Sequence, residues 1–149
     1  MKAVIQRVKN AEVIVDGTSV AQINRGILTL LGIARGDTET ETQKLIKKIC
    51  ELRIFEDETG KMNLSLLDIH GEHLIVSQFT LAADCNTGRR PSFTIAERPE
   101  QAQLLYGRAV ALSRELGIST ASGIFQANMQ ISLINDGPAT FVLEAKAQC

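Results

Sequence analysis

The segment Ser77-Gln78-Phe79-Thr80-Leu81 places two hydroxyl groups and an amide at the end of an apolar run. A Ser or Thr hydroxyl becomes a nucleophile when a nearby base activates it, and an amide can orient a substrate. Side chains of an extended strand alternate between two faces, so Gln78 and Thr80 point away from Ser77. The three polar groups therefore serve one pocket only if the strand bends or ends there. Otherwise they face solvent or a neighbouring strand.

No base is available to these hydroxyls in the local sequence. His73 is four residues from Ser77, which is about 13 Å along an extended strand at ~3.3 Å per residue. This distance excludes a local Ser-His pair. The two histidines of the chain, His70 and His73, flank Gly71-Glu72, where we predict a solvated turn. A metal site is the alternative there, but no third ligand is apparent, so we predict no metal.

The second candidate segment is Asn135-Asp136-Gly137-Pro138, which lies between two β-like runs. Gly137 has no Cβ, so its backbone can approach a partner closely, while Pro138 fixes φ and lacks an N–H. The dipeptide therefore presents carbonyl oxygens on a stiff turn. Such a turn either caps a hairpin or contacts a ligand.

Alternation and turn signals predict the strands that position these segments. The first four are expected to form an antiparallel meander, with Asp16-Gly17 as a two-residue hairpin turn. A buried strand leads into Ser77, and two more bracket the Gly-Pro pair. The expected strands are residues 3–8, 12–16, 19–23, 27–33, 74–77, 129–134 and 140–144.

Two helices are expected between the strands. Thr38 and Glu41 have the spacing of a capping box, and apolar residues follow at helical spacing: Leu45, Ile46, Ile49 and Leu52. Pro99 suits the first position of a second helix that ends before Gly117. Its expected inward stripe is Leu105, Ala109, Leu112 and Leu116. Because no linker, repeat or charge block divides residues 1–149, we predict one α+β domain with a largely antiparallel, barrel-like sheet and two main helices.

Composition narrows the classes of function. The 149 residues carry 16 basic and 17 acidic side chains, a balance that argues against gripping a long nucleic acid but permits docking of a short single-stranded end. The longest apolar stretch, 27–34, is too short to cross a bilayer. The N-terminus is typical of a strand and not of a signal peptide, and the three separated cysteines suggest neither disulfides nor a CxxC metal site. We predict a cytoplasmic protein with no membrane contact.

The two candidate segments resemble the signature motifs of the D-aminoacyl-tRNA deacylase family. The similarity extends nearly end to end, through residues 3–8, 55–57, 60–63 and 88–93. One departure follows Gly123-Ile124-Phe125, where the family usually continues Gly-Ala and this chain has Gln126-Ala127. The resemblance implies that Phe125 helps to hold the terminal adenosine of tRNA and that Arg7 braces the Gly-Pro loop. A surface arginine of a strand is the alternative for Arg7.

The resemblance implies a homodimeric hydrolase, without a cofactor, that acts at the 3′ acceptor end of aminoacyl-tRNA. It would cleave the ester of a D-amino acid and also remove glycine from mischarged tRNA. In the family the Gly-Pro bond is cis, and each subunit inserts it into the partner's site. The catalytic segment would then be Ser77, Gln78, Phe79 and Thr80. Substrate binding and chiral selection would fall to Gly137, Pro138, Asn135, Arg7, Phe125 and Met129.

Chirality gives the Gly137-Pro138 turn a function. Rigid carbonyls placed where an L side chain would lie exclude L-amino acids and can accept hydrogen bonds from the α-ammonium group. Glycine has no side chain and would pass such a filter. The attacking group has two alternatives. One is Thr80, which lacks a local base. The other is a water molecule assisted by the neighbouring 2′-OH of the RNA, with N–H groups near Phe79 stabilising the oxyanion. We favour water.

Two other functions compete with the deacylase. One is a non-catalytic nucleic-acid-binding module on the same fold, which the near-neutral charge and the presence of both motifs disfavour. The other is an unrelated small-molecule esterase, which the lack of a Gly-x-Ser-x-Gly nucleophile elbow disfavours.

Overall fold

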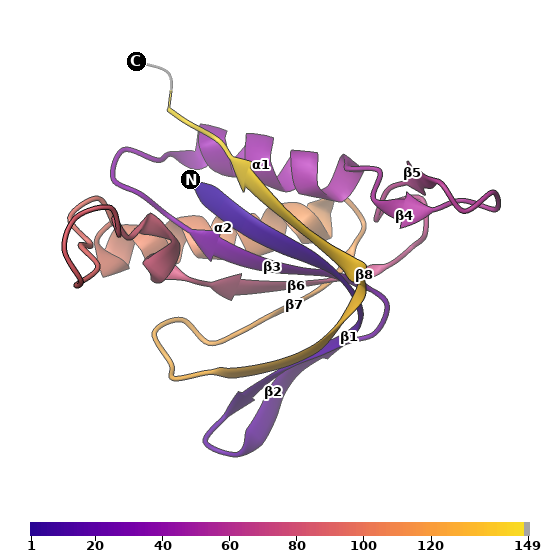
Figure 1. Cartoon of the computed structure of the whole chain (residues 1–149), viewed down its shortest axis with the longest axis horizontal. Helices are drawn as coiled ribbons and strands as arrows, with labels where there is room; N and C mark the ends of the chain where they lie inside the picture. Colours follow the sequence, from indigo (N-terminus) through magenta and orange to yellow (C-terminus); the bar gives the residue numbers. More distant parts are fainter. Residues whose placement is uncertain (148–149) are drawn as a thin grey trace.

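A long first strand organises the sheet (Figure 1). The structure is a computed structural model that describes residues 1–147, so Cys149 lies outside the described residues. The elements in chain order are β1 (Lys2–Val15), β2 (Thr18–Ile23), β3 (Gly26–Gly32), α1 (Glu39–Glu51), β4 (Phe55–Glu56), β5 (Met62–Leu64), β6 (Glu72–Ser77), the 3-10 helix η1 (Phe79–Ala82), α2 (Pro99–Glu115), β7 (Ser119–Ser122) and β8 (Gln130–Glu144).

Strand β1 replaces two predicted strands, and the predicted meander is wrong. Residues 9–11 contain neither glycine nor proline, so the chain continues extended through them. The first half of β1 pairs with β3 and the second half with β2, both antiparallel. Strands β2 and β3 therefore follow one another along the same edge of β1. The predicted Asp16-Gly17 turn is confirmed, with φ values of 49° and 77°.

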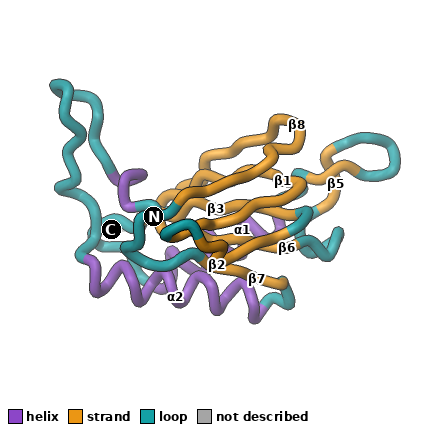
Figure 2. The backbone as a smooth tube through the Cα atoms, turned by 90° about the horizontal axis from the view of Figure 1, so that it is seen from below, coloured by secondary structure: helices purple, strands orange, loops and turns teal. Residues whose placement is uncertain are grey.

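The α+β fold with two main helices is confirmed. Strands β3, β6 and β7 are parallel, because α1 and α2 provide the crossovers that parallel neighbours require. The remaining pairs are antiparallel, and β8 lies along the other edge of β1. One core fills the space between the sheet and the helices, and a second lies within the curve of the sheet. The loop between η1 and α2 stands out from this body (Figure 2).

Strand β8 corrects the prediction of two strands separated by a turn. Both halves pair with β1, so Gly137-Pro138 is not at the tip of a hairpin. The pairing shifts register between Gln6↔Thr140 and Val8↔Asn135, which leaves residues 136–139 opposite Arg7 alone. The segment is therefore a large bulge within one long strand, a feature that re-aims the chain locally.

The helices confirm their predicted caps. Thr38 and Glu41 form a complete capping box at the start of α1, and Pro99 is the first residue of α2. The predicted inward stripe of α2 is partly wrong, because Leu116 is exposed. The buried residues of α2 are Leu105, Tyr106, Ala109, Val110 and Ser113.

The predicted solvated turn is wrong for His73, which lies in β6 with no exposed surface. Its ring nitrogens contact Thr29 Oγ1 at 2.7 Å and Ser113 Oγ at 2.9 Å. Burial lowers the pKa of His73 from 6.5 to about 3. His73 is therefore a neutral core residue whose polar atoms are both paired.

In residues 1–147 we find no helix with the length and apolar character needed to cross a membrane.

Candidate active site

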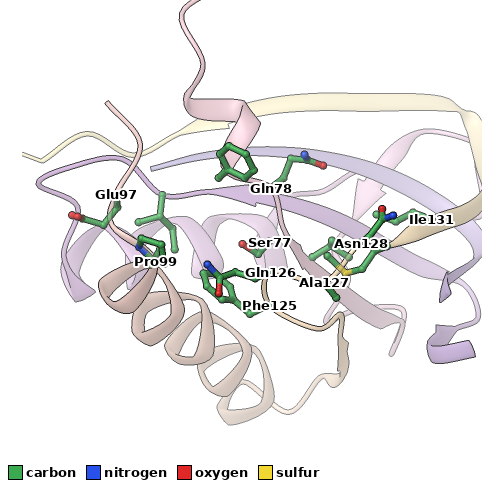
Figure 3. Close-up of a pocket in the computed structure, with 14 residues that line it drawn as sticks. Ser77, Gln78, Glu97, Pro99, Phe125, Gln126, Ala127, Asn128 and Ile131 are labelled. Atoms are coloured by element: carbon green, nitrogen blue, oxygen red, sulfur yellow. The ribbon is translucent and has the colours of Figure 1, made fainter. Parts of the chain in front are cut away.

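A cavity of about 560 Å³ opens at the C-terminal end of β6, inside the curve of the sheet (Figure 3). Its lining comes from the end of β6, from the chain before α2 and the first residues of that helix, and from the segment that leads into β8. Five predicted site residues line it: Ser77, Gln78, Phe79, Phe125 and Met129.

The catalytic segment changes backbone conformation at the edge of this cavity. Strand β6 ends at Ser77, and Phe79–Ala82 form η1, so the condition that the strand must end there is met. Thr80 is exposed and does not line the cavity; its Oγ1 accepts a hydrogen bond from the Gln78 amide. Phe79 is 58% exposed and its ring lies 5.2 Å from that of Phe93.

Two backbone donors are available beside the cavity. Phe79 and Thr80 open η1, and the first N–H groups of a helix have no partner within it. Neither N–H has a hydrogen-bond acceptor among residues 1–147. Such N–H groups can stabilise an oxyanion that forms at a substrate carbonyl.

The wall opposite this segment is held by a buried tyrosine. Tyr106 of α2 donates a hydrogen bond of 2.7 Å to the carbonyl of Ile75, and its ring lies 6.0 Å from that of Phe125. Burial raises the pKa of Tyr106, which keeps the hydroxyl protonated as a donor. Helix α2 therefore fixes the aromatic wall of the cavity.

The sequence prediction missed several lining residues. Glu97, Gln126, Asn128 and Ile131 also line the cavity. Glu97 reaches it because its N–H donates to the carbonyl of Ile33, a contact that no local pattern reveals. Gln126 stands where the family usually has glycine, and its φ of 64° explains why a glycine suits this position.

The Gly137-Pro138 loop has its own supporting contacts, and the peptide bond between these residues is cis. Arg7 is only 5% exposed, which excludes the alternative of a surface arginine. Its Nε donates to the carbonyl of Asp136 at 2.8 Å and its Nη1 to that of Ile54 at 2.7 Å. Asn135 closes the bulge: its Oδ1 accepts from the Ala139 N–H and its Nδ2 donates to Thr140 Oγ1, both at 2.8 Å.

Within one chain this loop does not meet the cavity. Arg7, Asn135, Gly137 and Pro138 are not among the lining residues. The loop lies in β8 beside Arg7, which pairs with Ile27 in β3, and Ile27 pairs with His73 in β6. The loop is therefore three strand spacings from β6, at the level of His73, which is four residues before Ser77. At ~4.8 Å between strands and ~3.3 Å per residue, the separation is roughly 20 Å. Within one chain the two motifs are therefore separate.

Comparison with known proteins decides the family. A family model described as D-Tyr-tRNA(Tyr) deacylase matches residues 4–144. The chain belongs to this family. A D-aminoacyl-tRNA deacylase of Geobacter sulfurreducens is 57% identical over 99% of this chain and 97% of its own length. One of Thermosipho africanus is 52% identical, with 98% of each chain covered. The resemblance to the deacylase family is thus confirmed.

Two solved structures have a fold similar to that of this chain. A protein described as c-Myc DNA Unwinding Element Binding Protein has a TM-score of 0.91 and 43% identity, covering 99% of this chain and 100% of its own. A probable eukaryotic D-amino acid tRNA deacylase has a TM-score of 0.82 at 17% identity, covering 95% and 97%. This second likeness bears on the deacylase fold alone.

Proposed function

We propose that this chain hydrolyses D-aminoacyl-tRNA at its 3′ acceptor end and spares L-aminoacyl-tRNA. The observation that carries the proposal is the cavity. Ser77, Gln78 and Phe79 of the family motif line it, beside N–H groups that have no acceptor among residues 1–147. Water adds to the ester carbonyl, the bond to the ribose oxygen breaks, and free D-amino acid and tRNA leave. Family membership supports this activity.

The working enzyme is proposed to be a homodimer in which each copy gives its Gly137-Pro138 loop to the partner's cavity. The separation of the two motifs within one chain supports this arrangement. Gly137 and Pro138 are exposed, so their carbonyls are accessible to a second copy. Exposed apolar side chains near both motifs, among them Phe79 and Ile134, are available for burial between copies.

Selection by exclusion follows from this composite site. Backbone carbonyls held by Arg7 and Asn135 would occupy the space that an L side chain needs, while a D side chain points elsewhere. Glycyl-tRNA lacks the excluded side chain and is therefore a second substrate in this proposal. The cytoplasmic location predicted from the sequence stays a prediction.

The attacking group is proposed to be water. Thr80 Oγ1 accepts a hydrogen bond from the Gln78 amide, and no histidine or carboxylate among residues 1–147 is hydrogen-bonded to it. An activated hydroxyl needs such a base. The N–H groups of Phe79 and Thr80 would stabilise the oxyanion of the tetrahedral intermediate.

Hydrolysis of matched D-tyrosyl-tRNA and L-tyrosyl-tRNA tests the proposal. We expect rapid release of D-tyrosine, with L-tyrosyl-tRNA left intact over the same period. Equal rates on the two substrates would contradict the exclusion mechanism. Glycyl-tRNA measured in parallel should be hydrolysed.

A nucleic-acid-binding module without catalysis is the second candidate. It is favoured by the 43% identical structure whose description names binding of a DNA unwinding element. The near-neutral charge disfavours it, since gripping a duplex normally requires excess basic residues. Tight binding of tRNA or DNA with no ester cleavage would favour this candidate over the deacylase.

A further inference from the structure

Gln126 occupies a backbone conformation that suits another residue better. A hydrogen bond from the Ala127 N–H to the Ile124 carbonyl closes a turn, and Gln126 is its third residue with φ 64°. A positive φ at this position favours glycine or asparagine, and other residues pay roughly 1–2 kcal/mol. A long side chain is therefore held where the backbone alone would not select it. Such local strain is concentrated at functional sites.

The Gln126 side chain lies on the cavity wall beside Phe125 (Figure 3). It is exposed, and its amide makes no hydrogen bond to the residues that the structure describes. No hydrogen bond of this side chain within residues 1–147 therefore offsets the strain. The free amide carries both a donor and an acceptor at the cavity wall, where a bound ligand could pair with them.

The rest of the cavity suits a flat, neutral ring. Phe125 offers an aromatic face, and Val76, Met129 and Ile131 add apolar surface. Among residues 1–147, no lysine or arginine lines the cavity, and the one charged side chain that does is the carboxylate of Glu97. A phosphate group is therefore disfavoured. An aromatic face with an amide at its edge is a common way to bind a nucleobase. Glutamine pairs with adenine through two hydrogen bonds.

We infer that Gln126 is a specificity residue for the terminal base of the RNA substrate. Its Oε1 accepts a hydrogen bond from the 6-amino group of adenine, and its Nε2 donates to a neighbouring ring nitrogen. The inference rests on the proposed function, since it assigns the cavity to the 3′ end of tRNA. In this assignment the Gln126 side chain recognises the base, whereas backbone groups act on the aminoacyl ester.

Direct binding of nucleosides tests this role without requiring catalysis. Adenosine and purine riboside, which lacks the 6-amino group, are titrated into the full-length protein and followed by NMR. We expect the wild type to bind adenosine about tenfold more tightly, within the range typical of a paired amide. In Gln126→Gly the two nucleosides should bind equally, while the melting temperature rises because the strained φ is relieved. Gln126→Asn, which keeps an amide, should retain part of the preference.

His70→Gly is the matched control. His70 also has a positive φ, 50°, but does not line the cavity, so its replacement should raise stability and leave the nucleoside preference unchanged. The inference is overturned if Gln126→Gly keeps the wild-type preference, or if the wild type shows none. Wild-type hydrolysis of D-tyrosyl-tRNA is measured separately, so failure of this inference is distinguishable from failure of the proposed function.

Discussion

Arg7 and Asn135 hold the backbone of the Gly137-Pro138 loop in place through their side chains. Gly137 has φ 143°, and a Cβ built there would lie 2.9 Å from Arg7 Nη2 and 3.0 Å from the Ala139 nitrogen. Only glycine fits this position without displacing the arginine that supports the loop. The conformation of Gly137 and the position of Arg7 therefore depend on one another.

Gly137→Ala should weaken chiral selection. The added methyl group displaces Arg7 or the bulge. In the proposed mechanism, a displaced carbonyl would no longer fill the space of an L side chain. We expect hydrolysis of L-tyrosyl-tRNA to rise at least tenfold relative to D-tyrosyl-tRNA, a change of about 1.4 kcal/mol. Gly107→Ala is the control, because a Cβ added there would meet no atom within 4 Å outside its own helix backbone, and alanine favours a helix. Unchanged selectivity in Gly137→Ala would rule out this role for the loop.

Thr80→Ala should lose little activity. The Thr80 hydroxyl is exposed, lies outside the cavity lining and is not bonded to a base among the described residues. Loss of a hydroxyl that only supports Gln78 should reduce the single-turnover rate constant of hydrolysis less than tenfold. A loss on the order of 10³-fold, or isolation of an acyl-enzyme at Thr80, would instead identify this residue as the nucleophile.

At the scale of elements, the bulge in β8 depends on β1 and on the loop before β4. Arg7 in β1 donates to Asp136 in the bulge and to Ile54, so a single buried guanidinium connects three segments. The carbonyls of Asp136 and Ile54 would otherwise lack these donors. Removal of this arginine should therefore affect stability and selectivity together.

Arg7→Met should lower the free energy of unfolding by about 2–4 kcal/mol, because it leaves two polar groups without their charged donor. Denaturation in urea gives this quantity, and the D/L hydrolysis ratio should fall in the same variant. Arg108→Met is the control: its ion pairs with Glu39 and Glu115 are exposed at the surface. Loss of such pairs should cost less than about 1 kcal/mol. Equal effects of the two substitutions would argue against a structural role for Arg7.

For the whole molecule, the pH dependence of stability and the proposed need for assembly both depend on contacts between several elements. The buried His73 links β6 to β3 and α2 through Thr29 and Ser113, so its charge state is tied to global folding. The separation of the cavity from the Gly-Pro loop ties the proposed activity to assembly. Stability against pH tests the first property, and mixing of variants tests the second.

Stability should fall as pH drops below about 6.5, because the unfolded chain then binds a proton at His73 while the folded chain, with a pKa of about 3, does not. The expected slope approaches about 1.4 kcal/mol per pH unit between pH 6 and 5, above the range where carboxylates titrate. His73→Gln keeps polar groups for Thr29 and Ser113 and should show a shallower slope in urea denaturation. The same slope in both proteins would assign the effect to other groups.

Subunit exchange tests the proposed dimer, because mixed dimers of two defective variants should recover selectivity. When Gly137→Ala subunits exchange with an excess of cavity-defective Phe125→Ala subunits, each mixed dimer contains one intact cavity facing one intact loop. We expect the L-tyrosyl-tRNA hydrolysis of the Gly137→Ala protein to fall toward the wild-type level as the partner is added. If each loop served the cavity of its own chain, selectivity would not recover. Sedimentation confirms that exchange has occurred.

The sequence was sufficient for features that depend on neighbours along the chain. The capping box at Thr38, Pro99 at the start of α2 and the Asp16-Gly17 turn are local, since each is stabilised by contacts within a few residues. The resemblance of two separated motifs also identified the family. Both results rest on residue order, which the sequence contains completely.

Tertiary structure decided what depends on contacts between distant segments. The sequence predicts His73 in a solvated turn, but the pairing of β6 with β3 buries it. The expected turn at Gly137-Pro138 is a bulge, because β1 is long enough to pair with both halves of β8. Gln126 joined the cavity wall through the turn before β8. Local propensity is worth a few tenths of a kcal/mol per residue, so long-range pairing and burial overrule it wherever the two disagree.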